Sequence, residues 1–482
     1  MLLSLLRIPV LLGCLTMTCL AADRPNIVMI LCDDLGWGDL GVHGHPHIQT
    51  PHLDRLAATG MRFTNFYSTA PVCSPSRVGL MTGRSPNRAG VYDWIPPSGR
   101  PRPDAREQVH LRREEITIPM LLQRAGYATC LSGKWHCNSA FNRESQPQPG
   151  DAGFDHWFAT QNNAAPSHEN PSNYVRNGEN VGEITGFSCQ IATDEVIRWA
   201  TERHQEHPDQ PFFAYLAFHE PHEPVASPPE LVDLYQGVTW SADQAQYYAN
   251  VHNVDLAVGR LVNALEELGV RENTLIVFSS DNGPETLRRY QRAKRSWGVT
   301  GDLRGQKLHT HDGGFHVAGI FNWPRGIAGG QVTDVVGSAL DILPTACELA
   351  GAELPDRPLD GMSLVSLLRT GTPAPRPKPL VWAYYNGIND ARVAMRHGAW
   401  KVLARLNGGQ FPKRTNLTPT TLKEAQTAEL THFEIYHIAA DPGEVVNLFD
   451  RGCPQQEELL QAIREGYAEL VQDSPAWPPV SR

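Results

Sequence analysis

Two apolar runs, far apart in the chain, each end beside short side chains that carry oxygen. Residues 26–32 and 274–279 are continuous runs of this kind. Each run leads to two carboxylate or amide side chains: Asp33 and Asp34 after the first, and Asp281 and Asn282 after the second. Such runs are typical of parallel strands that are buried on both faces. Ligands bind outside the carboxyl ends of parallel strands, so a sheet with these two strands side by side would bring the doublets together.

The two doublets together offer ligands for a hard metal ion. Three carboxylates and one amide carbonyl, with no histidine in the set, suit Ca²⁺, with Mg²⁺ as the alternative. Asp, Asn and Gly also dominate ordinary turns, which would be enough to explain either doublet alone. Both doublets in one chain, beside the cysteine motif described below, favour a metal site.

Elsewhere in the chain, helical patterns alternate with short apolar runs. Residues 116–125 predict a helix that is followed by a strand through Cys130, and residues 249–268 predict a helix that leads into the second apolar run. This alternation is typical of an α/β protein with a doubly wound, mostly parallel sheet flanked by helices.

A cysteine motif lies between the two apolar runs. It reads Cys73-Ser74-Pro75-Ser76-Arg77 and is followed by the sequence LMTGR at residues 80–84. Proline is favoured in the first turn of a helix, so a helix is expected to begin close to the cysteine. The amino end of a helix attracts anions through its free N–H groups and its dipole. The motif therefore predicts a reactive cysteine beside an anion site.

With these motifs, the chain resembles the type I, formylglycine-dependent sulfatases, which are arylsulfatase-like members of the alkaline phosphatase superfamily. The resemblance runs from about residue 24 to about residue 450. Three further segments carry it: GKWH at 133–136, PHEP at 221–224 and LRGQK at 303–307. It implies a sulfuric ester hydrolase with the fold just described and a smaller carboxyl-terminal domain.

In this family the motif cysteine is oxidised to formylglycine, whose hydrated aldehyde is the nucleophile. The resemblance thus implies that a formylglycine-generating enzyme, or an anaerobic sulfatase-maturating enzyme, acts on Cys73. A thiolate is a soft ligand that fits poorly among hard oxygen donors, whereas a geminal diol fits well. Residue 73 would then join Asp33, Asp34, Asp281 and Asn282 as a metal ligand, and Asp281 would help to deprotonate the attacking hydroxyl.

The resemblance also assigns roles to five basic side chains. Arg77 and Lys134 would hold the hydrated aldehyde in place. His222 and Lys307 would contact the sulfate and protonate the leaving alcohol, which is a general-acid role. His136 would remove a proton from the second hydroxyl, which expels sulfate and regenerates the aldehyde.

Two details qualify the match to the family. His219 and His222 lie three residues apart, and the family form Pro-His-x-Pro selects His222, so His219 is expected to be structural. Residues 312–318 read DGGFHVA where relatives usually have EGGxRVP. The shorter Asp312 and the replacement of arginine by His316 spare the expected ligands and nucleophile. They are expected to change the packing and the loop shape around them.

The expected substrate is a sulfated polysaccharide or oligosaccharide. The sulfate is expected to be removed in exo fashion from a galactose-type sugar. Residues 138–187 are rich in Asn, Gln, Pro and Gly, which we interpret as an irregular, substrate-shaping insert. Its candidates for sugar contacts, each with ordinary loop polarity as the alternative, are Asn162, Asn163, His168 and Asn170. Trp94 could stack on a sugar ring, with a buried packing role as the alternative.

Residues 1–22 predict a secretory signal peptide, with one charged side chain, an apolar stretch and small residues before the cleavage site. Its apolar run is too short for a membrane span, and no later segment qualifies. An exported, periplasmic or secreted protein is expected, with lipoprotein anchoring as the lesser alternative. The proline-rich residues 371–379 then separate a catalytic domain at 23–375 from a small α+β domain at 376–482, which ends in a helix at 457–471.

Charge and cysteine content exclude some classes and leave others open. The net charge is −10 and there is no basic run, which argues against nucleic-acid binding. Export permits disulfides, but the spacing of the cysteines identifies no pair. The oligomeric state is open. Rival interpretations are a phosphatase or phosphodiesterase of the same superfamily, a thiol enzyme, and a non-catalytic protein that binds sulfated glycans with Cys73 unmodified.

Overall fold

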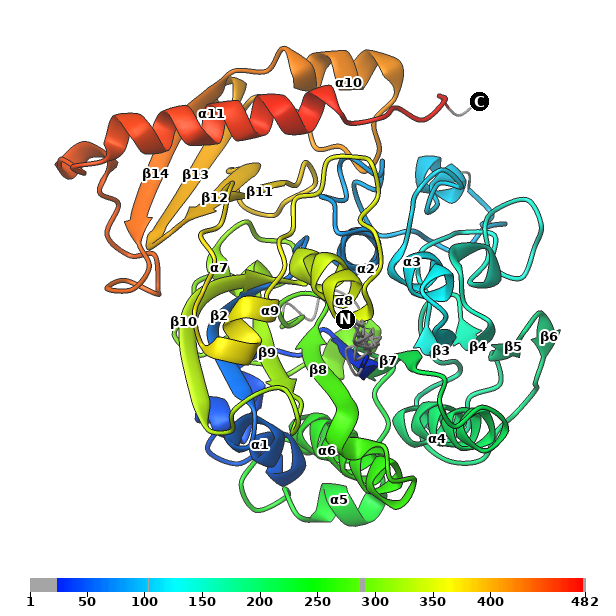
Figure 1. The fold of residues 1–482 in the computed structure, drawn as a ribbon. Helices are drawn as coiled ribbons and strands as arrows, with labels where there is room; N and C mark the ends of the chain where they lie inside the picture. The colour runs from blue at the N-terminus through cyan, green and yellow to red at the C-terminus, as the bar shows by residue number, and fades with distance from the viewer. Residues whose placement is uncertain (1–23, 103, 287–290, 480–482) are drawn as a thin grey trace, which may run out of the picture.

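The computed structural model describes residues 24–102, 104–286 and 291–479. Their core is a ten-stranded mixed sheet with helices on both faces, and a four-stranded antiparallel sheet packs beside it (Figure 1). This confirms the predicted fold class. The predicted signal peptide at residues 1–22 lies outside the described residues. Among the described helices, none is both long enough and apolar enough to cross a membrane.

The large sheet has the strand order β10-β2-β9-β8-β1-β7-β3-β4-β5-β6. Its central strands are parallel, while β9 runs antiparallel to both of its neighbours. The strands are β1 Asn26–Asp33, β2 Met61–Tyr67, β3 Ala128–Lys134, β4 His156–Thr160, β5 Val175–Arg176, β6 Glu179–Asn180, β7 Phe212–Pro221, β8 Thr274–Ser280, β9 His316–Asn322 and β10 Gln331–Ser338.

Strands β1 and β8 are parallel neighbours, as the two apolar runs predicted. Cys32, at the end of β1, lies opposite Ser280, at the end of β8, so the two strands stop at the same level. Successive side chains of β1 point to opposite faces of the sheet. Met29 belongs to one hydrophobic core and Ile30 to the other. Burial on both faces thus explains why these runs lack polar residues.

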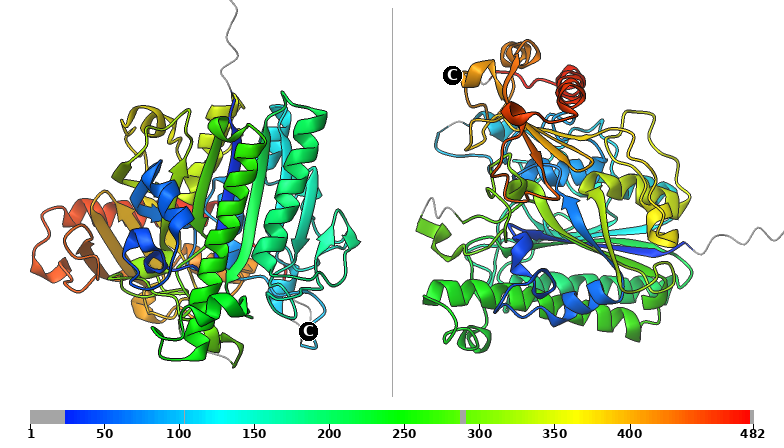
Figure 2. Two further views of the ribbon diagram at one scale, coloured as in Figure 1. Left: turned by 90° about the horizontal axis from the view of Figure 1, so that it is seen from below. Right: turned by 90° about the vertical axis from the view of Figure 1, so that its left-hand side faces the viewer.

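Each core is closed by its own layer of helices, as the views in Figure 2 show. One layer consists of α1 Pro51–Ala58, α4 Ser188–Glu206 and α6 Ala242–Glu267, with α5 Pro229–Asp233 packed on α6. The other consists of α2 Cys73–Thr82, α3 Ile118–Arg124 and α8 Ile342–Ala350, with α9 Val365–Thr370 packed on α8. A short helix, α7 Asp312–Phe315, precedes β9.

Two predictions about the elements need correction. The stretch at 138–187 is not wholly irregular, because β4 pairs in parallel with β3, and β5 and β6 extend that edge of the sheet. These strands have only two to five residues, too few for a pattern to emerge from polar surroundings. Helix α6 begins at Ala242, seven residues before its predicted start, with the Ser241 side chain as its cap.

The carboxyl-terminal sheet has the order β11-β12-β13-β14. Its strands are β11 Leu380–Ala383, β12 Val393–His397, β13 Trp400–Leu406 and β14 Leu430–His437, and its helices are α10 Pro419–Gln426 and α11 Gln456–Gln472. The apolar face of α11 is buried, with Ile463 fully enclosed. A Cβ on Gly466 would lie 2.7 Å from a methyl of Val381, so this glycine lets α11 approach β11 closely. The domain boundary at residues 375–376 stays a prediction.

Candidate active site

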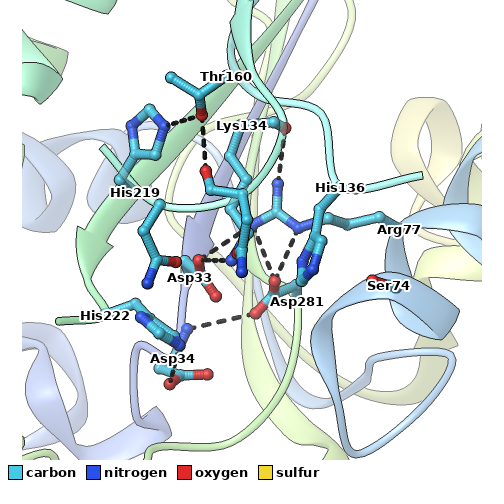
Figure 3. A network of polar contacts seen from close by, with 12 residues as sticks. Asp33, Asp34, Ser74, Arg77, Lys134, His136, Thr160, His219, His222 and Asp281 are labelled. Carbon is cyan, nitrogen blue, oxygen red and sulfur yellow. Dashed lines mark hydrogen bonds and ion pairs between the residues drawn. The ribbon is translucent and has the colours of Figure 1, made fainter. Parts of the chain in front are cut away.

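The ends of β1 and β8 are joined by hydrogen bonds between the predicted ligands themselves (Figure 3). Asp34 has a positive φ of 64°, and its N–H donates to Asp281 Oδ1 at 3.2 Å. The Asn282 side chain donates to Asp34 Oδ1 at 2.7 Å, and the Asp281 N–H donates to the Cys32 carbonyl at 3.1 Å. The doublets therefore converge as the sequence predicted, with their oxygens in one buried cluster.

Helix α2 brings the cysteine to this cluster. Cys73 is the first residue of the helix, in agreement with the prediction from the proline, and the whole helix is buried. Gly79 allows the close approach of Thr69, since a Cβ there would lie 2.2 Å from the Thr69 hydroxyl. The Ser74 hydroxyl accepts from the Ile95 N–H at 2.9 Å, which fixes the next loop to the helix.

Arg77 connects the helix to the ends of β8 and β3. Its Nε and Nη2 lie 2.9 and 2.8 Å from Asp281 Oδ2, and its Nη1 donates to the Lys134 carbonyl at 3.0 Å. Lys134, the last residue of β3, forms an ion pair with Asp33. Burial alone would raise the pKa of Asp33, but Lys134 and the other nearby cations hold it well below its usual range.

Lys307 and His222 face the second aspartate. Lys307 Nζ lies 2.6 Å from Asp34 Oδ1, and His222 Nε2 lies 3.6 Å from Asp34 Oδ2. His222 Nδ1 is 2.7 Å from the Glu223 carbonyl, so Nδ1 carries the hydrogen and Nε2 is the nitrogen turned toward the aspartates. Ligand atoms of Asp33, Asp34, Cys73 and His222 all lie within 4.8 Å of one another. The place of His222 in this group was not predicted, since the expected ligand set had no histidine.

The other two histidines differ in their surroundings. His136 has a φ of 51°, and its Nε2 donates to the Ile95 carbonyl at 3.0 Å. Its Nδ1 is buried and has no hydrogen-bond partner within the described part of the chain. His219 instead lies 2.7 Å from the Thr160 hydroxyl and 3.4 Å from the Tyr174 hydroxyl, which suits the structural role expected for it.

Two oxygens of the cluster have the environment of metal ligands. Asp33 Oδ1 and Asn282 Oδ1 are buried without a hydrogen-bond partner among residues 24–102, 104–286 and 291–479. A buried acceptor without a partner is costly, and such atoms usually bind an ion, a water or a ligand. Both lie among carboxylates in a set of hard oxygen donors. The residues therefore fit a hard divalent cation such as Ca²⁺ or Mg²⁺.

Burial governs the protonation of the remaining acids and of the cysteine. It raises the pKa of Asp34 to about 6, against the attraction of Lys307, and it raises the pKa of Asp281 to about 7 with help from Asp33. It also raises the pKa of the Cys73 thiol far above its usual range. A neutral thiol is a poor nucleophile and a poor metal ligand, so an unmodified Cys73 suits neither role.

A cavity of about 600 Å³ opens onto this cluster. Its lining includes Cys73, His136, His222 and Lys307, together with Trp94, Asn162 and Asn163, which were candidates for sugar contacts. The other two candidates have structural contacts: the His168 ring is 3.1 Å from the Asn250 amide, and the Asn170 side chain accepts from the Gly186 N–H.

Three polar lining residues were missed by the sequence reasoning: Arg100, Glu223 and Asn386. Asn386 comes from the carboxyl-terminal region and donates to Asp93 at 3.0 Å. No sequence signal marks it, because only the packing of that region brings it to the cavity. Glu223 stands inside the PHEP segment and could have been named from it.

The departure from the family pattern at 312–318 has a structural explanation. Asp312 is buried, and its Oδ1 accepts from Lys401 Nζ at 2.6 Å. Its Oδ2 accepts from the Tyr67 hydroxyl at 2.9 Å and lies 3.4 Å from His316 Nδ1. The shorter acid and the histidine thus belong to one network with a lysine of the small sheet.

Comparison with known proteins agrees with this geometry. The family model described as Sulfatase matches residues 25–352, more than half of the chain. N-acetylgalactosamine-6-sulfatase of Mus musculus is 32% identical over 94% of this chain and 88% of its own length. Human arylsulfatase A is 33% identical over 92% of this chain and 87% of its own.

Solved structures show the same relationship. The crystal structure of Ps i-CgsB in complex with k-i-k-neocarrahexaose has a TM-score of 0.75 and 26% identity, covering 94% of each chain. PsFucS1 sulfatase from Pseudoalteromonas sp. has a TM-score of 0.72 and 25% identity, covering 94% of this chain and 92% of its own. The chain therefore belongs to the sulfatase family and is a sulfuric ester hydrolase.

Proposed function

We propose that this sulfatase removes sulfate from a sulfated polysaccharide or oligosaccharide, acting in exo fashion on a galactose-type sugar. The nucleophile is formylglycine made from Cys73, and a bound divalent cation, Ca²⁺ or Mg²⁺, assists it. One observation carries the proposal. A buried cysteine with a strongly raised thiol pKa begins a helix beside two buried acceptors without partners in the described residues, at the floor of a cavity.

The cation site is assigned to four side chains: Asp33, Asp34, Asp281 and Asn282, with residue 73 as a fifth ligand after oxidation. Oxygens on Asp33 and Asn282 that have no partner in the described part of the chain support this assignment. When bound, such a cation would polarise the sulfate group and the nucleophilic oxygen. Lys134 and Lys307 now neutralise Asp33 and Asp34, and a cation on those carboxylates would leave both ammonium groups available to the substrate and to residue 73.

The remaining side chains have contacts that suit the proposed roles. Arg77 fixes Asp281 through two short contacts, so the orientation of that carboxylate toward residue 73 is set. His222 presents Nε2 beside Lys307 in the lining, where both could contact a sulfate and protonate the leaving alcohol. His136 lines the cavity, and its Nδ1 lone pair has no partner among the described residues, since its Nε2 holds the hydrogen. That nitrogen could accept the proton when sulfate leaves.

The cavity and the relatives together support a sugar substrate. A volume of about 600 Å³ is that of a pocket for a small ligand rather than of a groove for a long polymer, which favours exo action. Trp94 offers a ring face, although Arg106 lies 4.2 Å over it, and the amide groups of Asn162, Asn163 and Asn386 offer hydrogen bonds to hydroxyls. N-acetylgalactosamine, named for the 32% identical relative, is a galactose-type sugar.

Oxidation of Cys73 requires a maturating enzyme, either the formylglycine-generating or the anaerobic sulfatase-maturating type. Cys73 is buried in α2, so this enzyme would act before or during folding. Export through the signal at residues 1–22, to the periplasm or the medium, completes the proposal. The mass of the mature protein tests cleavage after Ala22.

The proposal is tested by the mass of the residue-73 peptide and by activity on a panel of sulfated sugars. We expect the aldehyde or its hydrate at residue 73, and release of sulfate from a terminal galactose-type sulfate. Cys73→Ala, made in the same host, should retain the fold and lose activity. A protein that is active with an unmodified thiol would refute the formylglycine mechanism. Activity on fucose sulfates but not on galactose-type sulfates would refute only the sugar.

A further inference from the structure

A second cavity, of about 340 Å³, lies between the large and small sheets. Its lining comes from β10, α9 and the residues just before it, the linker that follows α9, and the end of β12. Figure 1 shows where these elements lie. It shares none of its described lining residues with the active-site cavity. Most of its wall is apolar, with Val336, Leu364 and Leu367 among the contributors.

The polar part of this wall is almost wholly basic. It carries Arg376, Lys378, Arg396 and His397, and no aspartate or glutamate lines it within the described residues. Lys378 is paired with Glu469 in the solvent-exposed rim. Arg376 is paired with Asp341 through Nη2, yet its Nε and Nη1 are buried without partners in the described chain.

Arg396 reaches a carboxylate only indirectly, because the Tyr67 hydroxyl that accepts from it donates to Asp312 at 2.9 Å. It is 3% exposed and donates to two neutral oxygens, the Tyr67 hydroxyl at 3.0 Å and the Asn65 side chain at 3.3 Å. Its Nη1 has no hydrogen-bond partner, and no carboxylate pairs with it, within the part of the chain that is described. The His397 Nδ1 beside it is likewise without a partner there. Buried charges in proteins are normally paired, because an isolated one is costly.

We propose that this cavity binds an organic anion with a carboxylate or sulfonate-type head and an apolar body. The head would accept hydrogen bonds from the guanidinium groups of Arg376 and Arg396, which prefer planar or tetrahedral oxyanions. Their unpartnered nitrogens are enclosed in the present arrangement, so binding would turn these side chains toward the cavity. The body would lie against the aliphatic wall, where the burial of apolar surface favours binding. An inorganic anion would satisfy the donors but leave that wall uncovered.

Calorimetric titration with 1-octanesulfonate tests the proposal, with sodium octanoate as a second arm and sodium sulfate as a third. One site per chain is expected for an octyl anion, and the arm with the tighter binding identifies the head group. Sulfate alone should bind at least tenfold more weakly, because it lacks the apolar body. Equal affinity for sulfate would overturn the proposed ligand class.

Two variants locate the site. Arg376→Gln removes free donors, and Ala374→Trp places a bulky ring at an exposed lining position without disturbing the core. Both should weaken octyl-anion binding at least tenfold, while Arg414→Gln, which alters an arginine paired with Glu424 elsewhere, should not. Lys307→Ala, in the active site, should leave binding unchanged. Loss of binding in Lys307→Ala with retention in Ala374→Trp would assign the anion to the active site and sink the proposal.

Discussion

Replacing Arg77 by lysine keeps the positive charge but removes most of the guanidinium contacts at the centre of the site. The guanidinium is fully buried and has three short polar contacts: two with Asp281 Oδ2, at 2.8 and 2.9 Å, and one with the Lys134 carbonyl, at 3.0 Å. A longer ion pair joins it to Asp33 Oδ2 at 3.8 Å. A lysine ammonium is a compact charge at the end of a flexible chain, and it cannot reproduce the several contacts of the planar guanidinium group. It can retain about one of the three contacts.

The expected loss is large. A hydrogen bond that involves a charged group contributes about 1.5–3 kcal/mol, so the loss of two lowers the free energy of unfolding by about 3–6 kcal/mol. The catalytic effect has a separate cause. Asp281 would be free to rotate away from residue 73, and a misplacement of about 1 Å at a reacting group can cost about 10²-fold in rate. We therefore expect kcat to fall by about 10²-fold or more.

The assay compares Arg77→Lys with Arg84→Lys, which disrupts another buried arginine–carboxylate contact, that of Arg84 with Glu115 at 2.9 Å. Urea unfolding gives the stability of each, and a chromogenic aryl sulfate gives kcat, normalised to the formylglycine content measured by mass. Both variants should lose stability, but only Arg77→Lys should show the predicted fall in kcat. If Arg77→Lys keeps kcat within threefold of the wild type, the positioning argument is wrong.

Three further predictions address backbone, metal and pH. Gly133→Ala would place a Cβ 1.8 Å from the Ala217 carbonyl, so β3 must shift and kcat should fall about 10²-fold, whereas Gly150→Ala, with 3.6 Å to its nearest neighbour, should be mild. Ca²⁺ at 100 times its Kd should stabilise the protein by about 2.7 kcal/mol in thermal unfolding, and Asn282→Leu should abolish that gain. Burial raises the pKa of Glu444 from 4.5 to about 8, so folding takes up a proton between these values. Wild-type stability should therefore fall with rising pH, by at most about 1.4 kcal/mol per unit, relative to Glu444→Gln in urea titrations; parallel pH curves would contradict this assignment.

The central part of the fold was predictable because its constraints are local. The apolar runs at 26–32 and 274–279 had to be buried, and the doublets after them had to lie at the strand ends. Short strands such as β4 were not predictable, since five residues among polar neighbours carry too little periodicity. The cavity residue Asn386 was beyond reach for another reason, because its position depends on how the small sheet packs against the large one.

The small sheet is packed against the loop that carries Lys307 and helps to position it. The loop that carries Lys307 continues into α7, whose first residue, Asp312, accepts from Lys401 of β13. The Asp312 N–H also donates to Glu444 Oε2 at 2.8 Å, so backbone and side chain are both held by the carboxyl-terminal region. Lys401 is fully buried, and a buried ammonium requires such a carboxylate. Because Asp312 is held by both Lys401 and Glu444, the position of this loop and the position of the small sheet depend on the same contacts.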